Sequence, residues 1–259
     1  MSPGHNAGEV PPVRITAAAT AADRVAADVV LLPGRAAFLP ATATLLVADL
    51  HLGKAAAFRR AGIPVPEGSA QADLARLERL VRATAARRLL VLGDLFHHAS
   101  GCTAEVYAEF AAARARLAAT EVLLVLGNHD RRIGRLPASL GLDGCPPTLD
   151  EPPFRLVHDP AAAVPDRFTI AGHLHPTCAI GAPSGDRIRD RCYVADPALL
   201  VLPAFGSFTG GLRLEHAAGR RLWIARDDGV VEVTRLAELA ARPARGRPQA
   251  GGRAARKPT

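Results

Sequence analysis

The chain has 259 residues, of which 49% are hydrophobic and 22% are charged, as in an ordinary folded protein with one large core. No apolar run approaches the roughly 18 residues of a membrane helix, and the N-terminus lacks the basic-then-apolar order of a signal peptide. Four cysteines, spaced too widely for a CxxC pair, are expected to be reduced structural thiols. These features argue against a membrane or secreted protein and predict a cytoplasmic one.

The formal net charge of +7 is concentrated at the C-terminus. Six basic residues and no acidic one follow position 241, which leaves 26 basic against 25 acidic residues in 1–240. Residues 241–259 are rich in Pro, Gly and Ala and are expected to form a disordered basic tail. That tail either holds phosphate backbones electrostatically or only solubilises the chain, and the sequence leaves both open.

Turn signals and periodicity predict the first elements. Residues 1–12 show no pattern and are expected to be a loose end. Val29–Leu32 and Ala36–Leu39 flank a Pro-Gly turn and predict a hairpin. Apolar residues at helical spacing then predict helices over 69–87, with a serine as N-cap, and over 103–119.

Three short apolar runs alternate with these helices and predict buried strands: Thr44–Val47, Leu89–Leu92 and Val122–Leu126. The resulting β-α-β-α-β order requires a parallel sheet with right-handed crossovers. After residue 130, six strand-like runs alternate with turns and predict a mostly antiparallel second sheet: 154–157, 168–171, 192–195, 199–202, 222–225 and 230–233. We therefore expect one α/β domain over 1–240, a four-layer αββα sandwich of two sheets flanked by helices.

Residues that can bind metal ions follow the predicted strands. In chain order they are Asp49-Leu50-His51, Gly93-Asp94, Gly127-Asn128-His129-Asp130, Val157-His158 and Gly172-His173-Leu174-His175. Ligands bind at the carboxyl edge of the strands in open α/β sheets. Carboxylate and amide oxygens with imidazole nitrogens can hold two cations about 3.5–4 Å apart, which clamp a phosphoryl group and activate water.

Each of these segments has a plain structural explanation by itself. Asp at a strand end often caps a helix, Gly-Asn-His-Asp is a good turn sequence, and a lone histidine such as His158 is usually structural. Their joint occurrence in this order instead favours a dinuclear metal site. Mixed oxygen and nitrogen ligands suit Mn²⁺ best, with Fe, Zn²⁺ and Mg²⁺ as alternatives.

The ordered pattern resembles that of the calcineurin-like metallophosphoesterases over about residues 45–176. The resemblance implies that one ion is bound by Asp49, His51, Asp94 and His175. It implies that a second ion is bound by Asp94, Asn128, His158 and His173. His129 would donate a proton to the leaving oxygen, while Asp130 orients its imidazole. One departure is Asp159, where many members have Gly; it removes no ligand but could change access or metal preference.

Longer stretches are similar to the bacterial ligase-associated DNA-damage-response phosphoesterases, the PdeM branch: Ala48–Lys54, Gly93–His98, Gly172–Pro176 and Leu202–Gly211. This likeness implies a phosphodiesterase or endonuclease that acts on DNA in repair, with a co-encoded DNA ligase and helicase. The ligand set itself serves monoesters, diesters and pyrophosphates alike. A small-substrate phosphoesterase and a nucleic-acid-binding scaffold with a structural metal therefore remain alternatives, and homo-oligomerisation is left open.

Residues beside the pattern carry weaker predictions. Lys54 either contacts a phosphate or is solvated. Arg59 and Arg60 either extend a basic rim or are simply exposed. His97 and His98 follow Asp94 closely and are candidates for hydrogen bonds to a metal ligand.

Three further residues are expected to have structural roles only: His5 and His216 at the surface, and Trp223 in the core. Specificity is expected in the loops around 54–68, 96–102 and 131–153. With 4% aromatic residues, the composition gives no sign of a base-stacking platform of the single-strand-binding type.

Overall fold

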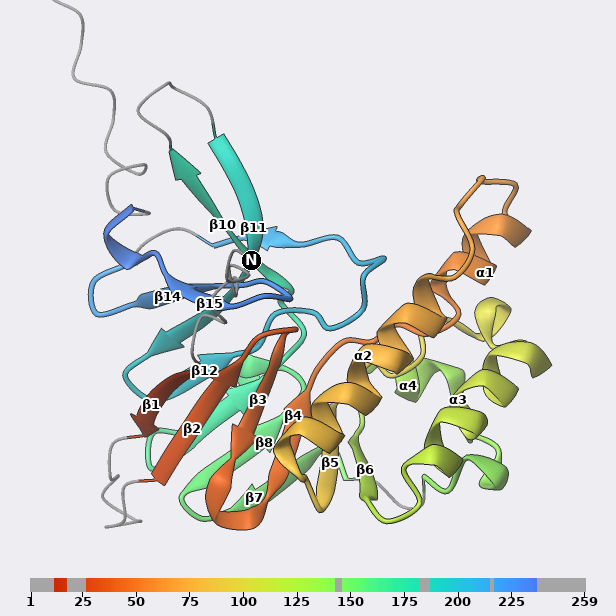
Figure 1. The fold of residues 1–259 in the computed structure, drawn as a ribbon, viewed down its shortest axis with the longest axis horizontal. Helices are drawn as coiled ribbons and strands as arrows, with labels where there is room; N and C mark the ends of the chain where they lie inside the picture. Colours follow the sequence, from red (N-terminus) through yellow and green to blue (C-terminus); the bar gives the residue numbers. More distant parts are fainter. Residues whose placement is uncertain (1–11, 18–26, 143–145, 182–186, 215–216, 237–259) are drawn as a thin grey trace, which may run out of the picture.

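The structure is a computed structural model of the chain, and it describes residues 12–17, 27–142, 146–181, 187–214 and 217–236. The predicted loose N-terminus up to residue 11, His5, His216 and the predicted basic tail lie outside the described residues. The described residues form two sheets and four α-helices (Figure 1). No helix among the described residues is long and apolar enough to cross a membrane.

The first sheet has the strand order β1-β2-β3-β4-β5-β6. Its strands are β1 (Val13–Ala17), β2 (Ala27–Leu32), β3 (Ala36–Leu39), β4 (Thr44–Val47), β5 (Arg88–Leu92) and β6 (Glu121–Val125). Strands β2 and β3 form the predicted hairpin. Strands β4, β5 and β6 are parallel, which confirms the parallel sheet predicted from the β-α-β-α-β order.

Four α-helices accompany this sheet: α1 (Lys54–Arg60), α2 (Ser69–Thr84), α3 (Ala104–Arg116) and α4 (Asn128–Ile133). Helices α2 and α3 confirm the two predicted helices. The prediction of Ser69 as N-cap is wrong, because the cap is Gly68 in a left-handed conformation with φ of 87°. Helix α2 ends at Thr84 because Ala85 also turns left-handed, with φ of 49°.

The second sheet has nine strands among the described residues, seven of them in the order β13-β10-β11-β12-β9-β8-β7, with β14 beside β11 and β15 beside β14. Its strands are β7 (Thr148–Glu151), β8 (Phe154–Val157), β9 (Phe168–Ala171), β10 (Pro176–Gly181), β11 (Arg187–Asp196), β12 (Leu199–Val201), β13 (Leu212–Arg213), β14 (Arg221–Ala225) and β15 (Val230–Glu232). The prediction of a mostly antiparallel sheet is confirmed, since five of the eight strand pairings described in it are antiparallel. Three pairings are parallel: β8 with β9, β9 with β12, and β10 with β13. The fold is thus two mixed sheets with helices, as expected for the α/β sandwich.

Strand alternation explains how the layers pack. Leu46 and Leu90 point between the two sheets, where they join a core that contains Tyr193 and Trp223. Leu45 and its neighbours on the opposite face pack against α2 and α3. Successive side chains on a strand face opposite sides, so each parallel strand contributes to both cores and is apolar after its first residue. Trp223 is fully buried, as predicted.

A polar contact also joins the sheets. The buried Tyr193 hydroxyl on β11 lies 2.7 Å from the carbonyl oxygen of Leu32 and 2.8 Å from that of Ala36. It donates to the turn of the predicted hairpin, so a residue of the second sheet fixes the hairpin of the first. Burial raises the pKa of the Tyr193 hydroxyl, so it remains a donor.

Candidate metal centre

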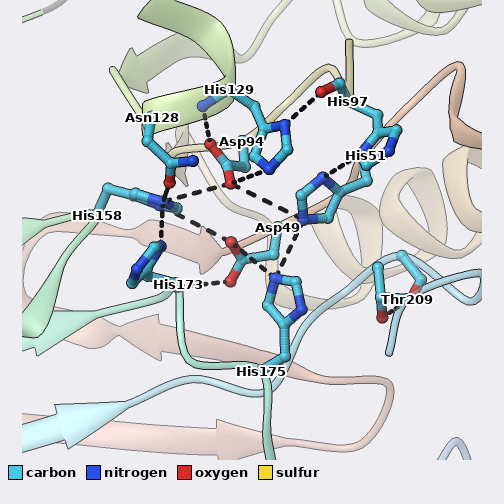
Figure 2. A network of polar contacts seen from close by, with 12 residues as sticks. Asp49, His51, Asp94, His97, Asn128, His129, His158, His173, His175 and Thr209 are labelled. Atoms are coloured by element: carbon cyan, nitrogen blue, oxygen red, sulfur yellow. Dashed lines mark hydrogen bonds and ion pairs between the residues drawn. The ribbon is translucent and has the colours of Figure 1, made fainter. Parts of the chain in front are cut away.

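The strand ends of both sheets bring the predicted ligands together (Figure 2). Asp49, Asp94 and Asn128 follow β4, β5 and β6 in the first sheet. The other three strand-end ligands follow β8 and β9 in the second sheet: His158, His173 and His175. His51 lies two residues after Asp49. All seven predicted metal ligands therefore lie in one cluster at the carboxyl edges of the strands, where ligands bind in such sheets.

One group of atoms surrounds the position expected for the first ion. Nε2 of His51 lies 3.1 Å from Nε2 of His175, which in turn lies 3.3 Å from Oδ1 of Asp49. Oδ2 of Asp94 lies 3.9 Å from Nε2 of His51. The residues are buried or half-buried, and the ligand atoms of Asp49, His51 and His175 all lie within 4.8 Å of one another.

A second group surrounds Nε2 of His158. That nitrogen lies 3.0 Å from Oδ1 of Asn128, 3.0 Å from Nδ1 of His173 and 3.4 Å from Oδ2 of Asp94. Nδ1 of His158 donates to the carbonyl oxygen of Leu92 at 2.9 Å, which leaves the lone pair of Nε2 facing the group in the neutral ring. Because Oδ2 of Asp94 contacts both groups, it is placed to bridge two ions.

The donor set fits two divalent cations. Neighbouring ligands in an octahedral site with bonds of about 2.1 Å lie about 3.0 Å apart, close to the spacings of the two groups. Oδ1 of Asp49 is buried and has no hydrogen-bond partner among the described residues. Since an unpaired buried carboxylate oxygen is costly, this atom is suited to a cation. Carboxylate, amide and imidazole donors without thiolate favour Mn²⁺, Fe, Zn²⁺ or Mg²⁺ over a thiolate-bound metal.

Electrostatics point the same way. Burial, with repulsion from His175, lowers the pKa of His51 to about 2, so its ring is neutral. Burial acts to raise the pKa of Asp94, but the hydrogen bond from His158 and the amide of His129 outweigh it and lower that pKa to about 2. Burial likewise acts to lower the pKa of His158, but Asp94 and Asp49 outweigh it and raise it to about 8. The carboxylates of Asp49 and Asp94 thus favour a positive charge beside His158.

The main chain is left-handed at five of the seven ligands: Asp49 (φ 56°), His51 (φ 50°), Asp94 (φ 51°), His173 (φ 71°) and His175 (φ 46°). A residue with a side chain pays about 1–2 kcal/mol for this conformation. Such strain clusters at functional sites, where the surrounding structure holds it. The bend expected after the first ligand strand is therefore present, and it turns Asp49 and His51 towards one point.

Replacing Gly93 with alanine is expected to displace His158. Gly93 has φ of 78°, and an added Cβ would lie 2.3 Å from Nδ1 of His158. Gly62 has the same φ of 78° but no atom within 4 Å of an added Cβ, so Gly62→Ala is a matched control. Both variants should lose about 1–2 kcal/mol of unfolding free energy from the backbone. Only Gly93→Ala should lose more and bind less metal, as read by denaturant unfolding and metal analysis; equal metal contents would contradict this placement.

His129 lies at the edge of the cluster, and its orientation differs from the sequence-based expectation. Its Nδ1 donates to the carbonyl oxygen of His97, and its Nε2 lies 3.8 Å from Oδ2 of Asp94 (Figure 2). Asp130 is buried and instead accepts the amides of Phe96 at 3.2 Å and Gly127 at 3.1 Å. The prediction that Asp130 orients the ring is therefore corrected: the His97 carbonyl does so, and Asp130 holds the loop.

The neighbouring histidines differ from each other. Nδ1 of His97 lies 3.3 Å from Nδ1 of His51, and its ring stacks on His129 at a centroid distance of 5.0 Å. His97 thus contacts a ligand, as predicted. The same prediction is wrong for His98, whose Nδ1 accepts the amide of Ser100 at 3.1 Å. Burial, with repulsion from Lys54, lowers the pKa of His97 to about 4.

Asp159, the departure from the family pattern, is exposed and turns away from the cluster. Its carboxylate accepts the amide of Ala161 at 2.8 Å and so caps the turn Pro160–Ala162. Because of this contact, the carboxylate of Asp159 is not part of either group of metal ligands, although it follows His158 in the sequence. Lys54, Arg59 and Arg60 line a cavity of ≈ 620 Å³ that reaches His51.

The chain was compared with known proteins. It matches the calcineurin-like phosphoesterase family over residues 43–188. The crystal structure of the Pseudomonas putida nuclease MPE is similar, with 35% identity and a TM-score of 0.68 over 80% of this chain and 95% of that chain. The phosphoesterase Yfce from E. coli is 15% identical with a TM-score of 0.38, over 73% and 96% of the chains, too weak a likeness to support an inference. No curated protein matched.

The family match covers more than half of the chain, and the nuclease is similar over most of both chains. Members of this family bind two divalent metal ions, for which the described residues provide the two donor groups above. The chain belongs to the calcineurin-like phosphoesterases and is a hydrolase of phosphoester bonds.

Proposed function

We propose that the protein is a dinuclear metal-dependent phosphodiesterase that cleaves nucleic acid, with DNA as its substrate. The observation that carries this proposal is the convergence of seven donor side chains into two groups that share Oδ2 of Asp94. A pair of cations at that spacing suits a phosphoryl group. The similarity to a nuclease at 35% identity supports a phosphodiester of nucleic acid over other phosphate esters.

Asp49, His51, Asp94 and His175 would hold one ion, and Asp94, Asn128, His158 and His173 the other. Two such ions, when bound, supply Lewis-acid polarisation of phosphoryl oxygens and lower the pKa of water. As water attacks and forms a new bond to phosphorus, the bond from phosphorus to the leaving oxygen breaks, and Nε2 of a protonated His129 gives its proton to that oxygen. Nδ1 keeps its own proton on the His97 carbonyl, so the ring holds its orientation throughout.

The finer proposal is that the chain belongs to the PdeM branch, uses Mn²⁺ and acts in DNA repair beside a co-encoded ligase and helicase. The stretches Ala48–Lys54 and Leu202–Gly211 support the branch. In the structure these two stretches are adjacent, since the amide of Gly206 donates to the carbonyl oxygen of Asp49 at 3.1 Å. A cytoplasmic location follows from this role and belongs to the same proposal.

Assays of one Mn²⁺-loaded preparation on an oligonucleotide, a cyclic nucleotide and a nitrophenyl monoester test the proposal. The expected result is internal cleavage of the oligonucleotide with kcat/KM well above the value for the monoester, because the proposed site is for diesters. Asp94→Asn, purified in the same way, controls for a contaminating nuclease and should be inactive. Monoester hydrolysis far above diester hydrolysis would contradict the proposed substrate class.

A further inference from the structure

A cavity of ≈ 620 Å³ opens beside the metal centre. His51, a predicted metal ligand, forms part of its wall, and so do Lys54 at the start of α1 and Phe208 from the loop after β12. The cavity extends along α1 to the first turn of α2, represented by Ser69, and to Glu105 in α3. In Figure 1 these three helices gather on one side of the sheets. A substrate bound at the ions therefore has a continuous path into this space.

Two aromatic rings and one ammonium group form a cluster at the cavity. The rings of Phe58 and Phe208 meet edge to face with centroids 5.5 Å apart. Nζ of Lys54 lies 5.9 Å from the centroid of Phe58 and 5.8 Å from that of Phe208. The ring of Phe58 lies 6.4 Å from His97, which in turn contacts His51. His97 therefore links this cluster to His51, a predicted metal ligand.

The charge at the cavity is available to a ligand. Among the described residues, no carboxylate lies within ion-pair distance of Lys54. The four acidic residues of the cavity wall have other partners or are exposed. Asp73 forms an ion pair with Arg76 at 2.8 Å, and Glu109 accepts a hydrogen bond from Gln71. Glu105 forms a hydrogen bond with Thr103, and Glu67 is exposed. Lys54 is one of only two lysines in a chain that otherwise uses arginine. Burial also lowers the pKa of its ammonium group, which reflects its half-buried position.

The loop that carries Phe208 is held in place by Asp73 on α2 and Arg191 on β11. Asp73 accepts the amide of Ser207 at 2.6 Å and its hydroxyl at 2.5 Å. Arg191 donates to the carbonyl oxygens of Ser207 at 2.8 Å and Thr209 at 3.2 Å. The residues on both sides of Phe208 are therefore fixed by buried or half-buried charged groups. A ring held in this way offers contact area at little cost in conformational entropy.

We propose that Phe208 and Lys54, backed by Phe58, form a subsite for the nucleoside next to the scissile phosphodiester. The base stacks on Phe208, and the ammonium group of Lys54 binds the neighbouring phosphate. An aromatic face accepts any base, so the subsite recognises a nucleotide without reading its sequence. Although only 4% of residues are aromatic, the fold brings Phe58 and Phe208 together from distant parts of the chain. This inference rests on the proposed function and names the part of the substrate that the cavity binds.

Steady-state hydrolysis of thymidylyl-thymidine and of its analogue that lacks both bases, by the Mn²⁺-loaded protein, tests the subsite. Phe208→Leu should lower kcat/KM for the dinucleotide by about 5- to 150-fold, mainly through KM, which is the equivalent of the roughly 1–3 kcal/mol that a stacked base contributes. The loss on the analogue, which has no base or other aromatic ring, should be much smaller. Lys54→Gln should weaken binding of the dinucleotide in a salt-dependent way, and Lys54→Arg should restore most of it.

Dinucleotides with one base removed identify the contact directly. If Phe208 binds a base, removing that base from the substrate and removing the ring from the protein cost the same interaction, so the two losses are not additive. Phe38→Leu removes a half-buried ring from β3, away from the cavity, and Arg213→Gln removes an exposed cation; both are matched controls. Unchanged circular dichroism and metal content establish that each variant is folded.

The inference and the proposed function fail in different ways. Equal losses of Phe208→Leu on both esters, or additive losses with the abasic dinucleotides, would overturn the subsite while leaving the phosphodiesterase intact. Absence of diester hydrolysis by the unmodified protein would overturn the proposed function. In that case, calorimetric titration with thymidine 3′- and 5′-monophosphate against methyl phosphate still tests the subsite, since Phe208→Leu must abolish any preference for the nucleotides.

Discussion

Exhaustive removal of divalent metal is expected to abolish phosphodiester hydrolysis and to lower the thermal stability of the protein. The physical reason lies in the two buried carboxylates, Asp49 and Asp94, because Oδ1 of Asp49 has no hydrogen-bond partner in the described structure. A ligand at 100 times its Kd stabilises the native state by about 2.7 kcal/mol. For a chain of this size, that corresponds to an increase in Tm of about 5–10 °C.

Dialysis against EDTA, followed by metal analysis, activity assay and thermal melting, measures both effects. Separate reconstitution with Mn²⁺, Fe²⁺, Zn²⁺ and Mg²⁺ then identifies the ion that restores the activity and the ion that restores the thermal stability. Asp94→Asn is the matched variant, since it keeps the shape of the side chain but removes its charge, and it should show little metal-dependent change in Tm. Full activity in a preparation free of metal would refute the dinuclear mechanism.

His129→Ala is expected to lower kcat by about 10²–10⁴ on a dinucleotide, the usual range for a lost general acid. Metal content should be unchanged, because the ring of His129 lies at the edge of both donor groups, with Nε2 3.8 Å from Oδ2 of Asp94. The loss should nearly vanish on a nitrophenyl diester, since nitrophenolate leaves without a proton. A dinucleotide with its poor, alkoxide-like leaving group is therefore the informative substrate.

His98→Ala is the matched control for this experiment. His98 is exposed, and its ring contacts Ser100 outside the cluster, so its removal should leave kcat on both substrates unchanged. A His129→Ala variant with full kcat on the dinucleotide would refute the general-acid role. Equal losses on both esters would show instead that His129 acts on binding or on the position of Asp94, whose Oδ2 lies 3.8 Å from Nε2 of its ring.

Much of the first half of the fold could be predicted from local patterns. Leu45–Val47 and Leu89–Leu92 are short apolar runs, and such runs are typical of strands buried on both faces. The ligands after them were predictable for the same reason, since a strand end fixes where the next side chain lies. The second sheet was harder, because its parallel neighbours β9 and β12 are separated in the sequence by the hairpin of β10 and β11. Strand alternation carries no information on such pairing.

Several features of the site depend on tertiary contacts alone. The short helix α1 has an alanine-rich sequence with no apolar periodicity, and the loop containing Phe208 lies about 150 positions further along the chain. Their contact creates the wall of the cavity, and no local signal indicates it. The orientation of His129 has a similar origin. Asp130 is its sequence neighbour, but the backbone of Gly127 and Phe96 takes up that carboxylate, and His97 provides the acceptor.

The position of the metal centre between the sheets has a consequence for how the molecule unfolds. Asp49, His51, Asp94 and Asn128 come from the first half of the chain, whereas His158, His173 and His175 come from the second. Each donor group includes residues from both halves, so neither half provides the full ligand set of either ion. Bound ions would therefore connect the two halves once these have packed together. Amide hydrogen exchange in β5 and in β9 should then slow together on metal binding. Two fragments divided between α4 and β7 should therefore reassociate more tightly with metal than without it.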